Sequence, residues 1–226
     1  MMRFCLFDID GTLLRSGGAG KAAMEASLVE EFGLERVEAQ IPFSGRTDRA
    51  ISRDLLSAHR IEPHDDHIAR LLRGYLDRLP DCLRAYHGKV LPGVCELLDA
   101  LAGHDRVGIG LLTGNIREGA RLKLEHFGIF HYFGFGAYGD EHLDRDDVAR
   151  AAWAEVRRLD PACRPEDVWI IGDTPLDVRC ARAIGARVVA VATGWHSGEE
   201  LRLAEPDLLL PDLAEVDFLI GRLLEA

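Results

Sequence analysis

The chain opens with a short apolar run that ends in two carboxylates. Residues 4–7 are Phe-Cys-Leu-Phe, followed by Asp8, Ile9, Asp10 and Gly11. An apolar run with no polar face is typical of a strand buried on both sides of a parallel sheet, and Gly11 lets the backbone turn sharply after it. A single acid at this place often only caps the next turn or helix. Two acids one residue apart, followed by glycine, indicate an active site at the strand end.

Strand-like and helix-like segments alternate through most of the chain. Apolar strand-like runs lie at residues 107–113, 133–138, 168–171, 188–192 and 207–210. Helical spacing of apolar residues lies at residues 94–101, after Thr113, and at 148–159, 177–184 and 216–224. This alternation predicts an α/β fold with a doubly wound parallel sheet. Such sheets bind ligands at the carboxyl ends of their strands, so the fold is expected to gather the polar residues at those ends: Asp8, Asp10, Thr113, Asp173 and Asp177.

Residues 16–88 differ from this alternation. Their apolar residues recur at helical spacing over about 18–32, 48–56 and 66–79, which predicts a small all-helical domain inserted after the first strand. The α/β core domain is then expected to comprise residues 1–15 and 89–226. Glycines near the two crossings are candidate hinges: Gly17, Gly18, Gly20 and Gly88.

The spacing of the two acids suits hydrolysis of a phosphate ester. Asp8 can attack phosphorus and form an aspartyl-phosphate, while Asp10 can protonate the leaving oxygen and later activate water. Clustered carboxylates repel one another and resist simultaneous ionisation. A hard, oxygen-seeking cation such as Mg²⁺ would relieve that repulsion and screen the incoming phosphate.

The segment from Asp8 to Leu13, Asp-x-Asp-Gly-Thr-Leu, resembles the first motif of the haloacid dehalogenase superfamily of phosphohydrolases. Later segments are similar to the family's next motifs, in order. Thr113-Gly114-Asn115 resembles the strand-end Thr or Ser that hydrogen-bonds a phosphate oxygen, although a plain helix N-cap is the alternative for Thr113. Residues 168–177 resemble the acidic metal motif. The resemblance is closest to the phosphoglycolate phosphatase-like group with a helical cap.

The resemblance implies a set of ligands for metal and phosphate. Mg²⁺ is expected on the Asp8 carboxylate, the Asp10 backbone carbonyl and Asp173, with Asp177 bound directly or through water. Thr113 is expected to hold phosphoryl oxygens together with a cation, and Gly114 and Asn115 are expected to contact the substrate. Residues 16–88 correspond to the cap that, in many relatives, closes over the phosphate and selects the substrate.

The chain departs from the family at the basic motif. Relatives place a Lys, usually followed by Pro, upstream of the helix that precedes the acidic motif, and no Lys-Pro occurs here. A cation is needed to bind phosphate and to keep Asp8 ionised. Arg145 lies nearest the expected place, and Lys123 lies on the helix after Thr113. Both residues are candidates for this cation. The alternative for Arg145 is a surface ion pair with neighbouring acids, and the alternative for Lys123 is a solvated position on the helix.

The Gly-Arg-Thr-Asp segment at 45–48 holds a further candidate. Arg46 combines a positive side chain with a neighbouring glycine and is expected to contact the substrate. The alternative is that Arg46 only pairs with Asp48 or Asp54, while Thr47 or Asp48 caps the next helix.

Composition narrows the class of partner. The 226 residues include 27 Lys and Arg against 38 Asp and Glu, a net charge of −11, which disfavours nucleic acid and anionic membranes as partners. The five cysteines are scattered without a Cys-x-x-Cys pair, as expected of reduced thiols in the cytoplasm. Because the first strand starts so early, we expect no signal peptide, and no apolar run reaches the roughly 18 residues that span a membrane. We expect a cytoplasmic monomer or homodimer that acts on a small phosphorylated metabolite.

The sequence thus predicts a Mg²⁺-dependent phosphatase for a small monoester, phosphoglycolate-like or a sugar phosphate. A haloacid dehalogenase attacks carbon and needs no acid at the place of Asp10, so Asp10 argues against that activity. A phosphomutase would keep the same residues and return the phosphoryl group to the substrate. An inactive phosphate-binding regulatory relative is favoured only by the missing Lys-Pro. These last two remain alternatives.

Overall fold

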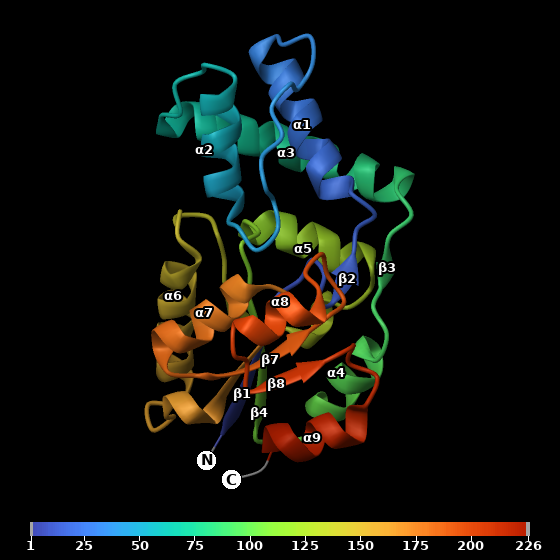
Figure 1. Cartoon of the computed structure of the whole chain (residues 1–226), viewed down its shortest axis with the longest axis vertical. Coiled ribbons are helices and arrows are strands. Elements are labelled where there is room, and N and C mark those ends of the chain that lie inside the picture. Colours follow the sequence, from blue (N-terminus) through green and yellow to red (C-terminus); the bar gives the residue numbers. More distant parts are fainter. Residues whose placement is uncertain (1, 225–226) are drawn as a thin grey trace.

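The protein is built on a six-stranded parallel sheet with helices on both faces, in a computed structural model that describes residues 2–224 (Figure 1). The strand order is β5-β4-β1-β6-β7-β8, and every neighbouring pair is parallel. The first strand, β1 (Arg3–Phe7), lies in the middle between β4 (Val107–Leu112) and β6 (Val168–Gly172). The predicted α/β class with a doubly wound parallel sheet is confirmed.

The remaining strands and helices follow the expected alternation with small shifts at their ends. The other strands of this sheet are β5 (Phe135–Ala137), β7 (Arg187–Val191) and β8 (Leu208–Leu210). The helices of this part are α4 (Val94–Ala102), α5 (Arg117–His126), α6 (Arg145–Leu159), α7 (Pro175–Ile184), α8 (Gly198–Leu203) and α9 (Val216–Leu224), with 3-10 turns at Phe130–Tyr132 and Pro165–Asp167. Helix α8 was not predicted from the sequence.

The apolar run in β1 contributes to two cores. Phe4 and Leu6 point to one face of the sheet, where they pack with residues of α6 and α7. Cys5 and Phe7 point to the other face, against α4, α5 and α9. Because successive strand residues alternate between faces, a strand covered on both sides has no polar face. This explains the apolar character of β1. The buried strand also fixes the position of Asp8, which follows its last residue at the carboxyl end of the sheet.

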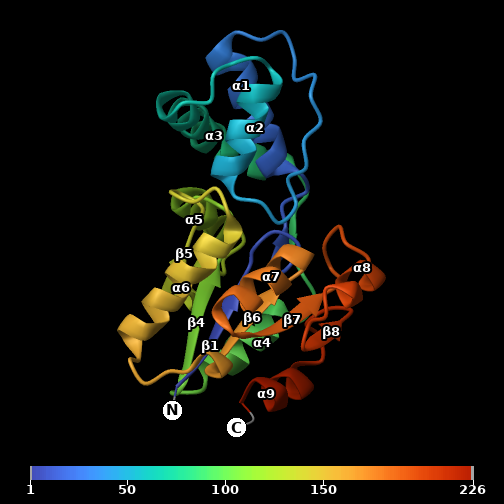
Figure 2. The ribbon, with the colours of Figure 1, turned by 60° about the vertical axis from the view of Figure 1, so that its left-hand side comes forward.

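A third apolar cluster holds α1 (Ala19–Phe32), α2 (Asp48–Ala58) and α3 (Asp65–Ala85) together. These helices lie beyond the ends of β1 and β4, as the two ribbon views show (Figures 1 and 2). At the two crossings, β2 (Leu14–Arg15) pairs antiparallel with β3 (Lys89–Val90). The predicted domain boundaries after residues 15 and 88 stay a prediction.

Helix length and composition bear on the membrane question. Among residues 2–224, no helix combines the length and the apolar character that crossing a bilayer requires.

Candidate active site

The carboxyl ends of β1, β4 and β6 bring the predicted residues to one edge of the sheet. Asp8 directly follows β1, Thr113 directly follows β4, and Asp173 directly follows β6. The Asp8 N–H donates to the Ile171 carbonyl at 2.9 Å, so the sheet pairing extends to the first acid. Asp177 joins the group from the first turn of α7. Residues more than 160 positions apart in the sequence therefore meet at one edge of the sheet, as the topology predicts.

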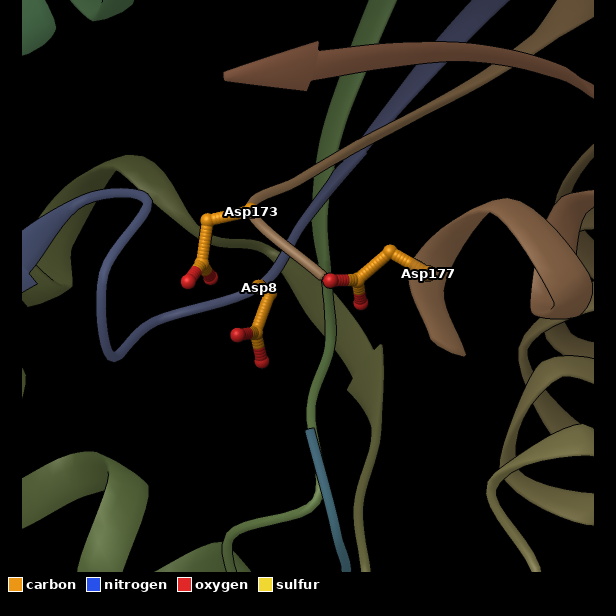
Figure 3. Close-up of side chains that lie close together, drawn as sticks. All are labelled: Asp8, Asp173 and Asp177. Atoms are coloured by element: carbon orange, nitrogen blue, oxygen red, sulfur yellow. The ribbon is translucent and has the colours of Figure 1, made fainter. Parts of the chain in front are cut away.

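Three buried carboxylates form the centre of this site. One oxygen each from Asp8, Asp173 and Asp177 lies within 4.8 Å of the others, and Figure 3 shows the three side chains converging from β1, β6 and α7. Asp173 Oδ1 accepts a hydrogen bond from Thr12 Oγ1 at 3.1 Å. Its Oδ2 is buried and has no hydrogen-bond partner within residues 2–224, which leaves it free to bind a ligand.

Both oxygens of Asp177 already have partners. Its Oδ2 accepts hydrogen bonds from the Thr174 N–H at 3.0 Å and the Thr174 hydroxyl at 2.8 Å, which closes a capping box at the start of α7. Its Oδ1 lies 2.6 Å from Arg145 Nη2. Asp177 therefore has less capacity than Asp173 for direct coordination of a cation, and a ligand role through water suits it better.

Burial makes the acid cluster electrostatically unfavourable without a cation. Burial raises the pKa of Asp8 to about 6, the Asp177 and Asp10 charges add to the rise, and Arg145 opposes it. Burial, together with the charges of Asp177 and Asp8, raises the pKa of Asp173 well above its usual range. Because like charges that share a buried site resist ionisation, the cluster fits a hard divalent cation with oxygen ligands.

Two glycines lie against Asp173, a contact that the sequence did not predict for either of them. A Cβ atom on Gly11 would lie 2.4 Å from Asp173 Oδ2, and one on Gly194 would lie 1.6 Å from it. The Thr193 hydroxyl donates to the Gly11 carbonyl at 2.6 Å and ties the two loops together. Gly11 belongs to the first motif, but nothing in the local sequence around Gly194 indicates its closeness to the acid.

Arg145 is buried at the first position of α6, against the nucleophile candidate. Its Nη2 lies 2.8 Å from Asp8 Oδ1 as well as 2.6 Å from Asp177 Oδ1. The alternative of a surface ion pair with neighbouring acids is wrong, because Asp144 pairs with Arg179 and Asp147 with Arg150. Asp144 instead caps α6 by accepting from the Asp146 N–H, which sets Arg145 at the helix start.

Lys123 is a second buried cation, and it contacts the other acid. Its Nζ lies 2.5 Å from Asp10 Oδ2 and donates to Asn115 Oδ1 at 2.7 Å. Asn115 Nδ2 donates to Asp10 Oδ2 at 3.0 Å. The alternative of a solvated helix position is therefore wrong for Lys123. The sequence left open which cation serves the site; the structure places both there, Arg145 on Asp8 and Lys123 on Asp10.

The turn after β4 is built around the Thr113 hydroxyl. Thr113 Oγ1 accepts from the Asn115 N–H at 3.2 Å and from Asn115 Nδ2 at 2.8 Å. The residue at the N-cap of α5 is Ile116, so the helix-cap alternative for Thr113 is wrong. Gly114 has no space for a side chain, because a Cβ atom would lie 2.1 Å from the Arg46 carbonyl oxygen.

Arg46 makes the ion pair that the sequence offered as the alternative. Its Nη2 lies 2.5 Å from Asp54 Oδ2, and its Nη1 donates to the Pro42 carbonyl at 3.2 Å. Thr47 caps α2 by accepting from the Ala50 N–H at 3.1 Å. The role of Arg46 as a substrate contact stays a prediction.

Comparison with known proteins agrees with this arrangement of motifs. The model of a family described as haloacid dehalogenase-like hydrolase matches residues 5–191. The chain therefore belongs to the haloacid dehalogenase-like hydrolases, and the resemblance inferred from its motifs is confirmed.

Within this family, the chain is similar to phosphoglycolate phosphatases. It is 29% identical over 214 residues to the phosphoglycolate phosphatase of Synechococcus elongatus, covering 92% of each chain. It is 26% identical over 242 residues to that of Escherichia coli, covering 95% of this chain and 91% of the relative.

Solved structures show the same fold. A predicted phosphatase from Clostridium acetobutylicum has a TM-score of 0.72 at 20% identity, covering 98% of this chain and 99% of its own. CbbY from Rhodobacter sphaeroides in complex with phosphate also has a TM-score of 0.72 at 20% identity, covering 96% of both chains.

Proposed function

We propose that this protein is a Mg²⁺-dependent phosphatase that hydrolyses a small phosphate monoester through an aspartyl-phosphate on Asp8. The observation that carries the proposal is the pairing of each motif acid with its own buried cation, Asp8 with Arg145 and Asp10 with Lys123. The phosphoglycolate phosphatases to which the chain is similar support hydrolysis of a phosphoric ester bond. The substrate is proposed to be a small phosphorylated metabolite in the cytoplasm.

Asp8 is the proposed nucleophile. Arg145 binds its Oδ1 and, as an adjacent positive charge, favours the ionised form that can attack. The new bond forms between a carboxylate oxygen of Asp8 and phosphorus, and the bond from phosphorus to the leaving alcohol oxygen breaks. Thr113 follows β4, and Lys123 on α5 reaches Asp10. The Thr113 hydroxyl and the Lys123 ammonium group are proposed to bind the phosphoryl oxygens.

Asp10 is the proposed general acid and base. Its side chain is 39% exposed, unlike that of Asp8, so it can reach both the leaving oxygen and water. In the first step it gives its proton to the leaving alcohol. In the second step it takes a proton from the water that attacks phosphorus and releases Asp8. Lys123 and Asn115 hold the carboxylate in place for both steps.

The residues that would hold Mg²⁺ are Asp8, the Asp10 backbone carbonyl and Asp173, with Asp177 in contact directly or through water. The unpartnered Asp173 Oδ2 and the mutual repulsion of the acids support this set. When bound, the ion supplies positive charge that lets an anionic nucleophile approach an anionic phosphate.

Magnesium is expected to raise the melting temperature more at high pH than at low pH. The pKa of Asp8 is raised from 3.8 to about 6, so between these values the folded protein holds a proton that the unfolded chain has lost. The stability that Asp8 contributes to the metal-free protein therefore falls as pH rises through this window, and this contribution is fully lost above it. Because Mg²⁺ competes with these protons, its stabilisation grows over the same window.

Thermal unfolding with Mg²⁺ or EDTA, at about pH 5 and about pH 8, measures this difference. Potassium chloride at equal ionic strength is the control for screening. A rise in Tm that is as large at the lower pH would contradict magnesium binding by the carboxylate cluster.

Asp10→Asn is expected to affect esters according to their leaving group. General acid catalysis contributes about 10²- to 10⁴-fold, so kcat/KM for an alkyl phosphate should fall at least about a hundredfold. The loss for p-nitrophenyl phosphate should be much smaller, because nitrophenolate leaves without a proton. The ratio of the two kcat/KM values, in variant and wild type, is the measurement. An equal loss of kcat/KM for both esters would show that Asp10 is not the general acid.

The direct test of the proposed activity is phosphate release from a panel of esters that includes phosphoglycolate, sugar phosphates and p-nitrophenyl phosphate. Magnesium-dependent release would support the proposal, and the best ester would identify the substrate class. If the folded protein released no phosphate from any ester, hydrolysis would be rejected. Isomerisation of a sugar phosphate without release would then point to a phosphomutase. The absence of both reactions would point to a non-catalytic phosphate-binding relative.

A further inference from the structure

Helix α5, which carries Lys123, begins without a capping side chain of its own. Its N-cap residue is Ile116, whose side chain has no polar atom to accept a hydrogen bond. The first N–H groups of a helix have no partner inside the helix, and a buried donor left unpaired is destabilising. Ile116 is buried. Its N–H therefore needs an acceptor from elsewhere in the molecule.

That acceptor comes from the helical part above the sheet. Asp48 Oδ2 accepts the Ile116 N–H at 2.9 Å. The Asp48 N–H in turn donates to the Gly114 carbonyl at 2.8 Å. Asp48 is buried at the first position of α2, so a residue 68 positions upstream caps a helix of the core. A carboxylate at this end of a helix is also favoured by the helix dipole.

The packing around this contact is tight. A Cβ atom on Gly139 would lie 2.2 Å from the Gly114 carbonyl oxygen and 3.1 Å from Thr47 Cβ. The Thr47 hydroxyl donates to the Leu143 carbonyl at 3.4 Å. The Ile116 side chain belongs to the apolar cluster of α1, α2 and α3 rather than to the two cores of the sheet. The start of α5 is thus held between the two parts of the molecule.

The same point of the chain positions the proposed phosphate-binding groups. Ile116 directly follows Asn115, whose amide binds both Asp10 and the Thr113 hydroxyl. Two turns further along α5, the Lys123 ammonium group reaches back to Asp10 Oδ2. A shift at the start of α5 would therefore displace groups on both sides of Asp10.

We propose that Asp48 is a positioning residue: its carboxylate, brought to the Ile116 N–H by the helical cap, holds the turn after β4 and Lys123 in the arrangement that binds phosphate. This inference rests on the proposed phosphatase function. It assigns the cap a contact that organises the catalytic groups, in addition to any contact with the substrate. Since the contact exists only when α2 lies on the core, the phosphate-binding groups are fully arranged only in that state.

The test compares Asp48→Ala with Asp48→Asn. Alanine removes the acceptor, and kcat is expected to fall at least about tenfold with a smaller change in KM, because the interaction acts on the transition state. Asparagine keeps an oxygen that can accept the Ile116 N–H, so Asp48→Asn should stay within about threefold of wild type. Asp65→Ala is the matched control, because Asp65 also begins a cap helix, α3, yet is exposed and pairs only with Arg49 in the described structure.

Amide hydrogen exchange of residues 114–118 gives a readout that does not require activity. Exchange is expected to be faster in Asp48→Ala than in wild type, Asp48→Asn and Asp65→Ala. Thermal melting curves check that all four proteins are folded. Unchanged exchange or near-wild-type kcat in Asp48→Ala would overturn the inference, as would an equal loss in Asp48→Asn. If the wild type itself released no phosphate, the proposed function would fail, whereas the exchange experiment would still report on the contact.

Discussion

Asp8→Asn is expected to lower kcat for phosphate release at least about a thousandfold, because an amide cannot act as the nucleophile that forms the phosphorylated intermediate. The substitution changes little else. Asparagine has nearly the same shape as aspartate, and Arg145 keeps its ion pair with Asp177. Removal of one of three clustered acids also relieves repulsion in the metal-free protein. The variant should therefore fold with a melting temperature close to that of wild type in EDTA.

Asp66→Asn is a suitable control for this substitution. Asp66 is exposed in the first turn of α3, so the same chemical change there should leave kcat unaltered. Phosphate release by Asp8→Asn at more than a few per cent of the wild-type rate would show that another residue is the nucleophile.

Arg145→Met is expected to have the second large effect, on both activity and stability. The guanidinium group lies between Asp8 and Asp177, and methionine fills similar space without the charge. Removing one partner of a buried ion pair costs about 3–5 kcal/mol, since the remaining charges stay buried. Activity should fall as well, with kcat/KM lower by at least about a hundredfold, because Asp8 loses the cation that keeps it ionised.

Denaturant unfolding in EDTA and in Mg²⁺ separates the two contributions. The loss of stability should be smaller in Mg²⁺, since the metal replaces part of the missing positive charge. Arg179→Met is the matched control: Arg179 pairs with Asp144 and Asp146 near the surface, where an ion pair contributes about 0–1 kcal/mol. Equal stability and activity in the two variants would contradict the role given to Arg145.

The positions of the acids could be predicted from the sequence because the carboxyl ends of neighbouring parallel strands lie on the same side of a sheet. The apolar runs that end at Asp8, Thr113 and Asp173 became the adjacent strands β1, β4 and β6. Nothing beyond the alternation of strands and helices was needed to bring these residues together.

The choice between the two cations could not be predicted, because it depends on burial and on side-chain reach. The apolar pattern of α6 starts only at Val148, so Arg145 and the acids beside it resembled a polar surface segment. In the structure Asp144 caps the helix four residues before that pattern begins, and Arg145 turns inward. Lys123 looked like an exposed helical residue for a similar reason, since its partners Asp10 and Asn115 come from two other loops.

Two further features lacked the length or the local pattern that sequence reasoning needs. Helix α8 has only six residues, which is too short for a helical period to be visible. Its capping box of Ser197 and Glu200 was the available signal. The hydrogen bond from the Ile116 N–H at the start of α5 to the Asp48 carboxylate has no local sequence signature, because the two residues belong to different parts of the fold.

The central claim is that Asp8 becomes phosphorylated during turnover, and trapping the intermediate tests it most directly. Asp10→Asn should release it slowly, so that variant is mixed with p-nitrophenyl phosphate and Mg²⁺ and treated with borohydride, which reduces an acyl phosphate of aspartate to homoserine. Peptide mass spectrometry is expected to find homoserine at position 8 only when the ester is present. An unmodified Asp8 in protein that is releasing nitrophenolate, or homoserine at another aspartate, would contradict the account.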